Sequence, residues 1–221
     1  MTRPLSLVPL LLEPFPVLSP PVSTAGAAVT IVLRDGATEP EVLLIERAPN
    51  PSDPASGQVA LPGGRVEDRD GSLASTALRE LEEEVGLSRT DLAGPLRFVG
   101  TDQARSSGLR VGVFAGELAP HGRSPGVRSS REVAHVFWLP RSQLNHVRRV
   151  TEETVRGPAE VLATVYEGHV LWGFTRRIVR DFFGLPSDAL PNGALFSSPR
   201  EDLRPLSAPP GPNQDGPSEA G

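Results

Sequence analysis

The apolar and polar positions of residues 72–87 repeat with the period of an α-helix. The apolar residues stand three or four positions apart and would share one side of the helix. They are Ala74, Ala77, Leu78, Leu81 and Val85. Ser72 is of the type that caps a helix N-terminus, and Gly86 is well placed to end the helix. The pattern therefore predicts an amphipathic helix that docks its apolar side on a core.

Shorter apolar runs before and after this helix predict strands. The predicted strands are residues 27–33, 41–47, 58–61, 96–101, 110–118 and 133–138, with a hairpin of 161–166 and 169–171 that turns through Glu167-Gly168. Residues 173–183 read as a last helix, ended by Gly184. The paired glycines Gly63-Gly64 are expected to form a loop before the central helix. Periodicity alone indicates a mixed α/β domain.

The two ends of the chain differ in composition from the middle. Residues 1–22 are expected to form an irregular or partly packed arm, because the apolar run of residues 5–12 is interrupted by Pro9. That run is far shorter than the roughly 20 residues of a membrane span, so no membrane association is expected. Residues 186–221 are rich in Pro, Ser, Gly and acids, and much of this tail is expected to be disordered. The folded domain is then expected over residues 23–185.

Composition narrows the classes of function. A chain of 221 residues suits one domain with tails. The absence of Cys excludes disulfides and thiolate metal sites, and it is compatible with the cytoplasm, the location that we expect. All 22 basic residues are Arg, which a high-GC genome explains. The net charge of -5 argues against a binder of duplex nucleic acid, which needs a basic surface.

Three acids follow one another on one side of the predicted helix. Glu83 and Glu84 lie one helical turn beyond Glu80, and the three acids centre roughly 120° from the apolar stripe. Like charges at this spacing repel by a few tenths of a kcal/mol per pair. Hard divalent cations bind such oxygen ligands, often together with substrate phosphates. A solvated, salt-bridged surface is the simpler alternative. The neighbouring glycines, Arg79 and Gly86 favour a metal-assisted phosphate site.

Residues 79–87, RELEEEVGL, match the second half of the Nudix box at every specified position. The box reads G-x5-E-x7-R-E-U-x-E-E-x-G-U, where U is a bulky aliphatic residue. The first half is one residue longer, which places Gly64 at the glycine position and Asp70 at the acid position. The chain therefore resembles the Nudix hydrolase family. The resemblance covers roughly residues 26–184.

The longer spacing resembles that of the coenzyme A pyrophosphatase subgroup. Residues 43–64 are similar to its upstream signature and match at Leu43, Leu44, Arg47, Ala48, Gly57, Pro62, Gly63 and Gly64. Three features depart from that signature: this stretch is one residue longer, the second arginine is missing, and Leu61 replaces a phenylalanine. Residues 132–140 and 171–175 resemble two further segments of the subgroup.

The resemblance implies a Nudix fold, a mixed β-sheet sandwiched between helices, and a Mg²⁺ or Mn²⁺ cofactor. It assigns Glu80 and Glu84 as the main metal ligands and Glu83 as a third ligand or the base that activates water. Arg79 would hold the glutamates by ion pairing without touching the substrate. Gly64 would let the backbone approach the metal site closely.

Residues from other segments complete the implied site. Glu132 is a candidate base or extra ligand, and a surface cap of the following strand is an equally weighted alternative. The candidates for binding substrate phosphates are Arg47, Arg65, Arg105 and Arg110, of which Arg47 matches a signature position.

The resemblance implies hydrolysis of a pyrophosphate bond in a nucleoside diphosphate linked to another group. Coenzyme A or acyl-CoA is the leading substrate, giving 3',5'-ADP and a 4'-phosphopantetheine. ADP-ribose, dinucleotides and nucleoside triphosphates are alternatives. A silent nucleotide-binding module and an acidic protein-interaction domain are competing hypotheses. The expected partner is a small nucleotide, and a homodimer is compatible with the sequence.

Overall fold

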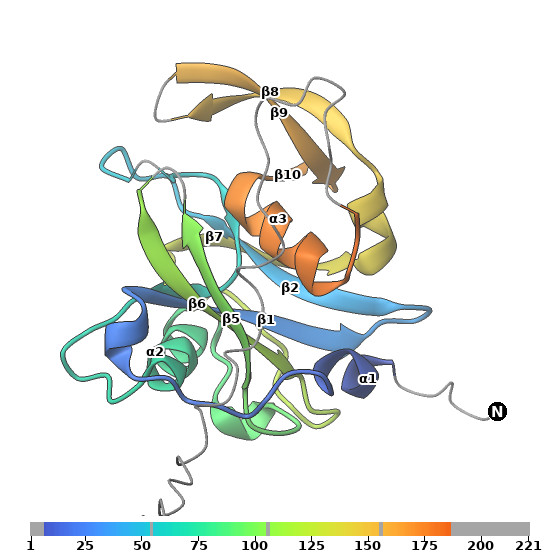
Figure 1. Cartoon of the computed structure of the whole chain (residues 1–221). Helices are drawn as coiled ribbons and strands as arrows, with labels where there is room; N and C mark the ends of the chain where they lie inside the picture. The colour runs from blue at the N-terminus through green and yellow to red at the C-terminus, as the bar shows by residue number, and fades with distance from the viewer. Residues whose placement is uncertain (1–6, 54, 105–106, 155–156, 187–221) are drawn as a thin grey trace, which may run out of the picture.

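A computed structural model describes residues 7–53, 55–104, 107–154 and 157–186. Within these residues the main sheet runs in the order β3-β2-β1-β6-β5, while β4 pairs with β1 and β7 pairs with β2 (Figure 1). Its strands are β1 (Ala27–Asp35), β2 (Pro40–Arg47), β3 (Val59–Ala60), β4 (Gly63–Arg65), β5 (Arg97–Ala104), β6 (Leu109–Glu117) and β7 (Val133–Pro140). β1 and β6 are parallel and the other pairs are antiparallel, so the sheet is mixed.

The central strands are apolar on both sides because both faces of the sheet are covered. In β2, Val42 and Leu44 join one core, and Leu43 and Ile45 join the other, as expected when successive side chains point to opposite faces. One core is covered by α1 (Val8–Leu12) and α3 (Gly173–Phe182), and the other by α2 (Leu73–Glu80) (Figure 1). The predicted sheet between helices is therefore present.

A second, three-stranded sheet has the order β10-β9-β8. It consists of β8 (Arg148–Thr154), β9 (Gly157–Tyr166) and β10 (His169–Trp172). The predicted turn at Glu167-Gly168 joins β9 to β10, and both residues have positive φ. β8 was not expected, because its sequence RRVTEET lacks the apolar alternation that predicts a strand.

Two local predictions need correction or completion. The Gly63-Gly64 pair is not a loop: it lies in β4, paired with Val29 and Ala28 of β1. The N-terminal arm includes α1, whose Val8 and Leu12 are buried in the core. Residues 1–6 and the predicted disordered tail beyond Pro186 lie outside the described residues.

The remaining helical segments are short. They are the 3₁₀ turns Val22–Thr24, Arg89–Asp91 and Arg141–Asn145 and the π-helical turn Leu81–Val85, which continues α2. No helix in the described part of the chain is both long and apolar enough to cross a membrane.

Candidate active site

The helix that carries the acids begins and ends where its sequence indicates. The backbone N–H of Ser75 donates to Ser72 Oγ at 3.2 Å, which caps the first turn. Ala77, Leu81 and Val85 of the predicted apolar stripe are buried in the core against the sheet, and Ala74 and Leu78 are partly buried against it. The last turn widens to a π-helix, and Gly86 ends it with φ of 75°, a left-handed conformation that glycine adopts without strain.

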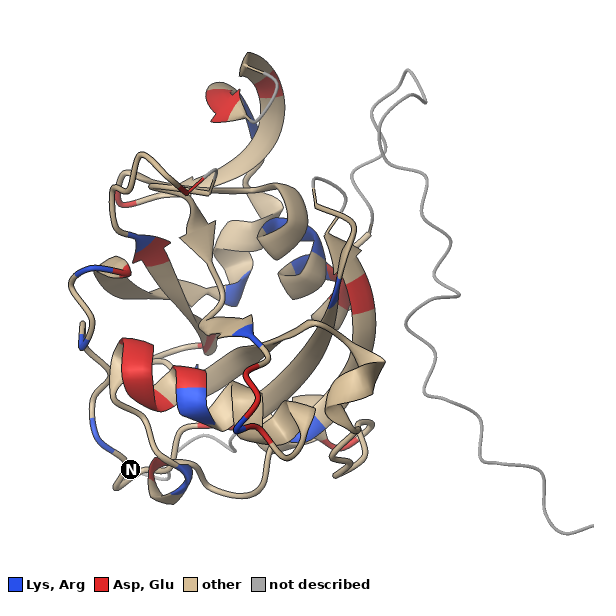
Figure 2. Ribbon diagram, turned by 90° about the vertical axis from the view of Figure 1, so that its left-hand side faces the viewer, with Lys and Arg blue, Asp and Glu red and all other residues tan. Residues whose placement is uncertain are grey.

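The three glutamates of this helix differ sharply in exposure. The Glu84 residue is 3% exposed, whereas the side chains of Glu80 and Glu83 are 13% and 43% exposed. The acids therefore run from the protein interior to its surface. Figure 2 shows acidic residues gathered along this helix, with a basic residue beside them.

Glu84 is the acid whose charge is least favoured by its surroundings. Burial raises the pKa of Glu84 to about 8, and the nearby charges of Glu80 and Glu132 act in the same direction. The Gly63 N–H, which donates to Glu84 Oε2 at 2.9 Å, and the charge of Arg47 oppose this rise only partly. A cation bound here would relieve an unfavourable buried charge.

Arg79 holds the other two glutamates in place. Its Nη1 donates to Glu80 Oε1 at 2.8 Å and to Glu83 Oε2 at 3.0 Å. Nε and Nη2 donate to the two oxygens of Asp70 at 3.1 and 3.0 Å, and Nη2 also donates to the Arg65 carbonyl at 2.9 Å. An arginine has five N–H donors. All five are used within the protein, so Arg79 has none left for a substrate phosphate.

Asp70 secures this arrangement from the loop that precedes the helix. One of its oxygens accepts from Thr76 Oγ1 and from the Glu67 N–H, each at 2.9 Å. The Arg79 guanidinium and these donors lower the pKa of Asp70 to about 2. Asp70 is therefore a charged anchor for Arg79 at neutral pH.

The glycine pair of β4 allows the backbone to lie directly against the acids. A Cβ on Gly64 would stand 2.3 Å from Glu80 Oε1. At Gly63, φ is 153°, and a Cβ would stand 2.3 Å from the Ala28 carbonyl oxygen of β1. No side chain fits at either position without a shift of its neighbours.

Glu132 and Arg47 reach the acids from the ends of two paired strands. Arg47 at the end of β2 lies opposite Val133 at the start of β7, and the Ala48 N–H donates to the Glu132 carbonyl at 2.9 Å. Burial raises the pKa of both Glu80 and Glu84, and the charge of Glu132 adds to this rise. Arg47 is oriented by Asp53, to which its Nη2 donates at 2.7 Å. The charges of residues 47 and 132 therefore act on the glutamate cluster.

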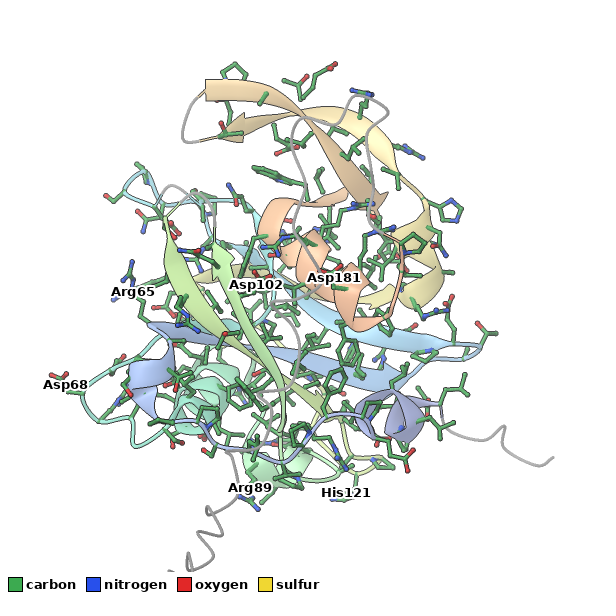
Figure 3. All side chains as sticks on the ribbon, in the orientation of Figure 1. Arg65, Asp68, Arg89, Asp102, His121 and Asp181 are labelled. Atoms are coloured by element: carbon green, nitrogen blue, oxygen red, sulfur yellow. The ribbon has the colours of Figure 1, made fainter. Side chains whose placement is uncertain are left out.

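The other predicted arginines are less closely engaged. The Arg65 side chain is exposed and stands at the outer edge of the molecule in Figure 3, while its carbonyl binds Arg79. Arg110 donates to Thr101 Oγ1 at 3.2 Å. Arg105 lies outside the described residues.

The loop between β6 and β7 was not expected to contribute to this site. Its Arg128 and Gly126 N–H groups donate to the carbonyls of Glu84 and Val85 at 3.0 and 3.1 Å. A Cβ on Gly86 would stand 2.4 Å from Arg128 Nε, so the glycine also makes room for this loop. Gly86 is the one sequence feature from which the close approach of this loop to the helix end could have been predicted.

The chemistry of these side chains fits a hard divalent cation, since carboxylate oxygens are its preferred ligands. Within the described ranges, however, no three acidic or histidine side chains already converge in a metal-binding arrangement. The hydrogen bonds from Arg79 direct one oxygen each of Glu80 and Glu83 toward its guanidinium.

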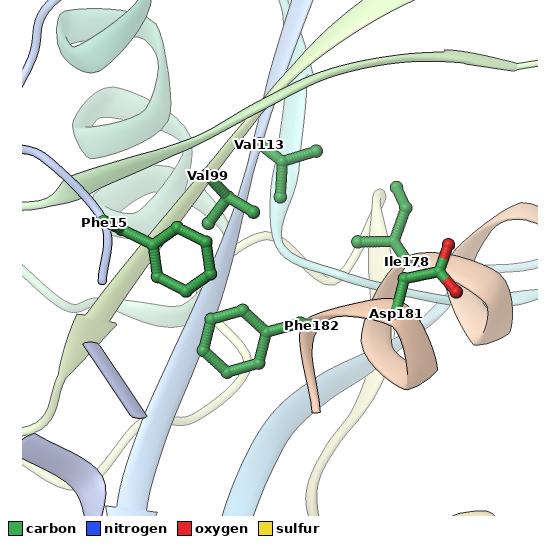
Figure 4. Close-up of a pocket in the computed structure, with 6 residues that line it drawn as sticks. All are labelled: Phe15, Val99, Val113, Ile178, Asp181 and Phe182. Atoms are coloured by element: carbon green, nitrogen blue, oxygen red, sulfur yellow. The ribbon is translucent and has the colours of Figure 1, made fainter. Parts of the chain in front are cut away.

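An apolar cavity lies elsewhere in the molecule, between the N-terminal arm, the sheet and α3 (Figure 4). Phe15 and Phe182 stack across it with ring centroids 5.4 Å apart, and Val99 and Val113 line it. These valines belong to the core on the sheet face opposite α2. The cavity is therefore not part of the acidic site.

Residues 24–165 match the family described as NUDIX domain. Proteins of Escherichia coli O1:K1 / APEC and Shigella boydii serotype 18, both described as uncharacterized Nudix hydrolase NudL, are 35% identical to this chain over 162 residues. Each match covers 71% of this chain and 79% of the relative.

Solved structures similar to this chain include a MutT protein from Methanosarcina mazei Go1, with a TM-score of 0.49 and 18% identity over 72% of this chain and 93% of that one. The NUDIX domain of Shewanella oneidensis NrtR, complexed with ADP ribose, has a TM-score of 0.44 and 19% identity over 54% of this chain and 74% of that one.

Proposed function

Because the chain belongs to the Nudix hydrolase family, which acts on pyrophosphate bonds of nucleoside diphosphate-linked compounds, we propose that its substrate is coenzyme A or an acyl-CoA. The products are 3',5'-ADP and a 4'-phosphopantetheine. The predicted Nudix fold and hydrolase class are confirmed.

The position of Arg47 is the main support for coenzyme A as the substrate. Arg47 matches the upstream signature of the coenzyme A pyrophosphatases, and its charge acts directly on the buried Glu84 carboxyl. A guanidinium beside the metal-binding acids suits a substrate whose pyrophosphate lies over them, because its planar fork binds phosphate oxygens in pairs. The ion pair with Asp53 orients the fork before the substrate arrives.

Glu80, Glu84 and Glu83 are the residues that would hold Mg²⁺ or Mn²⁺. When bound, such a cation polarises phosphoryl oxygens and lowers the pKa of coordinated water. Glu84 offers a buried carboxyl next to the Gly63 N–H, and Glu80 lies beside it under the Gly64 backbone. Gly64 serves the site by leaving room for Glu80.

Two residues are candidates for the base that takes the proton of the attacking water. Glu83 is partly exposed and is held by both Arg79 and Arg69, at 3.0 and 2.9 Å. Glu132 is exposed just before β7, and its charge acts on Glu80 and Glu84. Glu83 can serve instead as a third metal ligand, in which case Glu132 takes the proton.

Two arginines have different roles in this proposal. Arg79 is a positioning residue, because all its donors bind the protein. Arg65 has an exposed guanidinium next to Gly64 and can reach a substrate phosphate.

ADP-ribose, dinucleotides and nucleoside triphosphates form the second group of candidate substrates. The loop where the signature has its second arginine instead contains Asp53, which binds Arg47. An acid in place of that cation reduces the positive charge available to the 3'-phosphate of coenzyme A, and this favours substrates without it.

A substrate panel tests the proposal. Purified protein with Mg²⁺ or Mn²⁺ is incubated with coenzyme A, acetyl-CoA, ADP-ribose, NADH, dinucleoside polyphosphates and nucleoside triphosphates, and the products are separated by chromatography. We expect coenzyme A and acetyl-CoA to have the highest kcat/KM, and excess chelator to abolish turnover. Turnover of another compound with coenzyme A untouched would overturn the substrate assignment. Full activity in chelator would overturn the metal-dependent mechanism.

A further inference from the structure

We propose that β8 is a docking edge for β8 of a second copy of this chain, and that the two strands pair antiparallel about a two-fold axis. This surface lies in the β8–β9 hairpin and does not depend on the substrate proposed above. β8 is the outer strand of the three-stranded sheet.

The free side of β8 has the backbone groups that such pairing needs. Within the described residues β9 is the only strand paired with β8, so N–H and C=O groups on the other side of β8 point away from the sheet. β10 pairs with β9 only from Ala163 to Tyr166, so the outer part of the hairpin has two strands. A two-stranded ribbon is marginally stable by itself and gains from a further strand.

The hairpin is also accessible. In two views at right angles the outer ends of β8 and β9 stand clear of the rest of the described chain (Figures 1 and 2). A second molecule can therefore approach the β8 edge without displacing the main sheet or the helices.

The order of charges along β8 identifies the partner. The strand reads Arg148-Arg149-Val150-Thr151-Glu152-Glu153, with its positive charges first and its negative charges last. Antiparallel pairing places the positive half of one copy against the negative half of the other. Parallel pairing in register would place like charges opposite each other, which is unfavourable. The charge order thus favours one orientation of one partner, a second β8.

The geometry of a two-fold axis allows two central registers. Because the axis is normal to the sheet, a residue and the residue opposite it in the second copy have side chains on the same face. Side chains alternate between faces along a strand, so the two opposite residues differ by an even number of positions. Centred on Val150, the pairing sets Arg148 opposite Glu152 of the second copy and Arg149 diagonal to Glu153. Centred on Thr151, it sets Arg149 opposite Glu153 and Arg148 diagonal to Glu152. In both registers each arginine lies either opposite or diagonal to a glutamate of the second copy.

Arg149 is weakly held within its own hairpin. The nearest approach of Arg149 to Glu160 is 3.9 Å, and these side chains are 59% and 71% exposed. Such a pair contributes little. Charges on an edge strand usually discourage pairing, but here their order discourages every partner except a strand of complementary order.

Charge reversal and mixing test the proposal. The mass of the full chain is measured by analytical ultracentrifugation over a wide range of concentration. Wild type is expected to shift from monomer to dimer. Arg148→Glu with Arg149→Glu, and separately Glu152→Arg with Glu153→Arg, should each weaken dimerisation at least about tenfold, since like charges then meet. An equimolar mixture of these two proteins should form a heterodimer, and the fourfold swap should restore the homodimer.

A control of the same type uses Glu13→Arg with Arg89→Glu, two exposed residues outside the hairpin, and this protein should dimerise like wild type. Circular dichroism checks that each variant is folded. A wild type that stays monomeric at all concentrations would overturn the proposal. So would reversal variants that dimerise as wild type does, or a mixture that stays monomeric.

Discussion

Asp70 and Arg79 are joined by two hydrogen bonds, from Nε to Oδ1 at 3.1 Å and from Nη2 to Oδ2 at 3.0 Å. The Asp70 side chain is 4% exposed and comes from the loop before α2. The opposite side of the same guanidinium binds Glu80 and Glu83. The positions of two acids therefore depend on a residue that binds neither of them.

Asp70→Asn removes the charge of this anchor while keeping its size. We expect the free energy of unfolding at pH 7 to fall by about 1–3 kcal/mol, because a buried arginine loses one of its anionic partners but keeps Glu80 and Glu83. Urea unfolding measures the loss. The control is Asp68→Asn, since Asp68 is exposed and projects from the loop in Figure 3. Equal stability of the two variants would contradict the anchoring role.

The same pair predicts a specific sensitivity to acid. The pKa of Asp70 is lowered from its usual 3.8 to about 2, chiefly by the Arg79 hydrogen bonds. The resulting stability is fully present above about pH 4 and is lost as the pH falls toward 2; it amounts to about 2 kcal/mol. The difference in unfolding free energy between wild type and Asp70→Asn should therefore shrink over this interval. A difference that stays constant down to pH 2 would show that Asp70 is not the titrating group.

Gly64→Ala tests the close approach of β4 to the acids. The new Cβ would lie 2.3 Å from Glu80 Oε1, and Arg79 restrains that carboxylate. A displacement of Glu80 by about 1 Å can lower turnover on the order of 10²-fold. Gly71→Ala is the matched control, because a Cβ there meets open space. Steady-state kinetics on both variants decide the matter, and equal turnover would refute the steric argument.

Glu84→Gln should separate activity from stability. The pKa of Glu84 is raised from 4.5 to about 8 by burial, so its protonation supports the fold below about pH 4.5 and this support is lost as the pH rises through 8. In chelator at pH 8 the variant should exceed wild type in unfolding free energy, by on the order of 2 kcal/mol. With metal and substrate its turnover should fall by orders of magnitude. A variant that is less stable than wild type under these conditions would contradict the buried-charge argument.

Arg47→Ala should raise KM for coenzyme A more than it lowers kcat. A charged hydrogen bond to phosphate contributes about 1.5–3 kcal/mol, equivalent to roughly 10–100-fold in affinity. Arg89→Ala is the control, since Arg89 is exposed on the 3₁₀ turn at the lower edge of Figure 3. If KM is unchanged in Arg47→Ala, the guanidinium does not contact the substrate.

The sequence predicts those parts of the fold that depend on local patterns of residues. The helix stripe, the Ser72 cap and the end at Gly86 follow from residues close together in the chain, and the structure has all three. The π-helical last turn was not expected. It accompanies hydrogen bonds from Gly126 and Arg128 to the carbonyls of the helix end, and periodicity within the helix gives no sign of so distant a segment.

Contacts between distant segments also determine parts of the site that local sequence patterns do not predict. The spacing of Glu80, Glu83 and Glu84 places them on one side of a helix, but it does not show that Glu84 is buried, because that depends on β4 lying over it. Two adjacent glycines are typical of loops. Here they form a strand, since only residues without a side chain fit between β1 and the acids.

The three residues of β4 serve two purposes at once. They pair with Ala27, Ala28 and Val29 of the central strand, and they also supply the Gly63 N–H and the Gly64 surface to the acids. Enzymatic activity therefore depends directly on an intact main sheet. On heating, the loss of turnover should coincide with the cooperative unfolding of the main sheet, with no preceding stage in which a folded enzyme is already inactive.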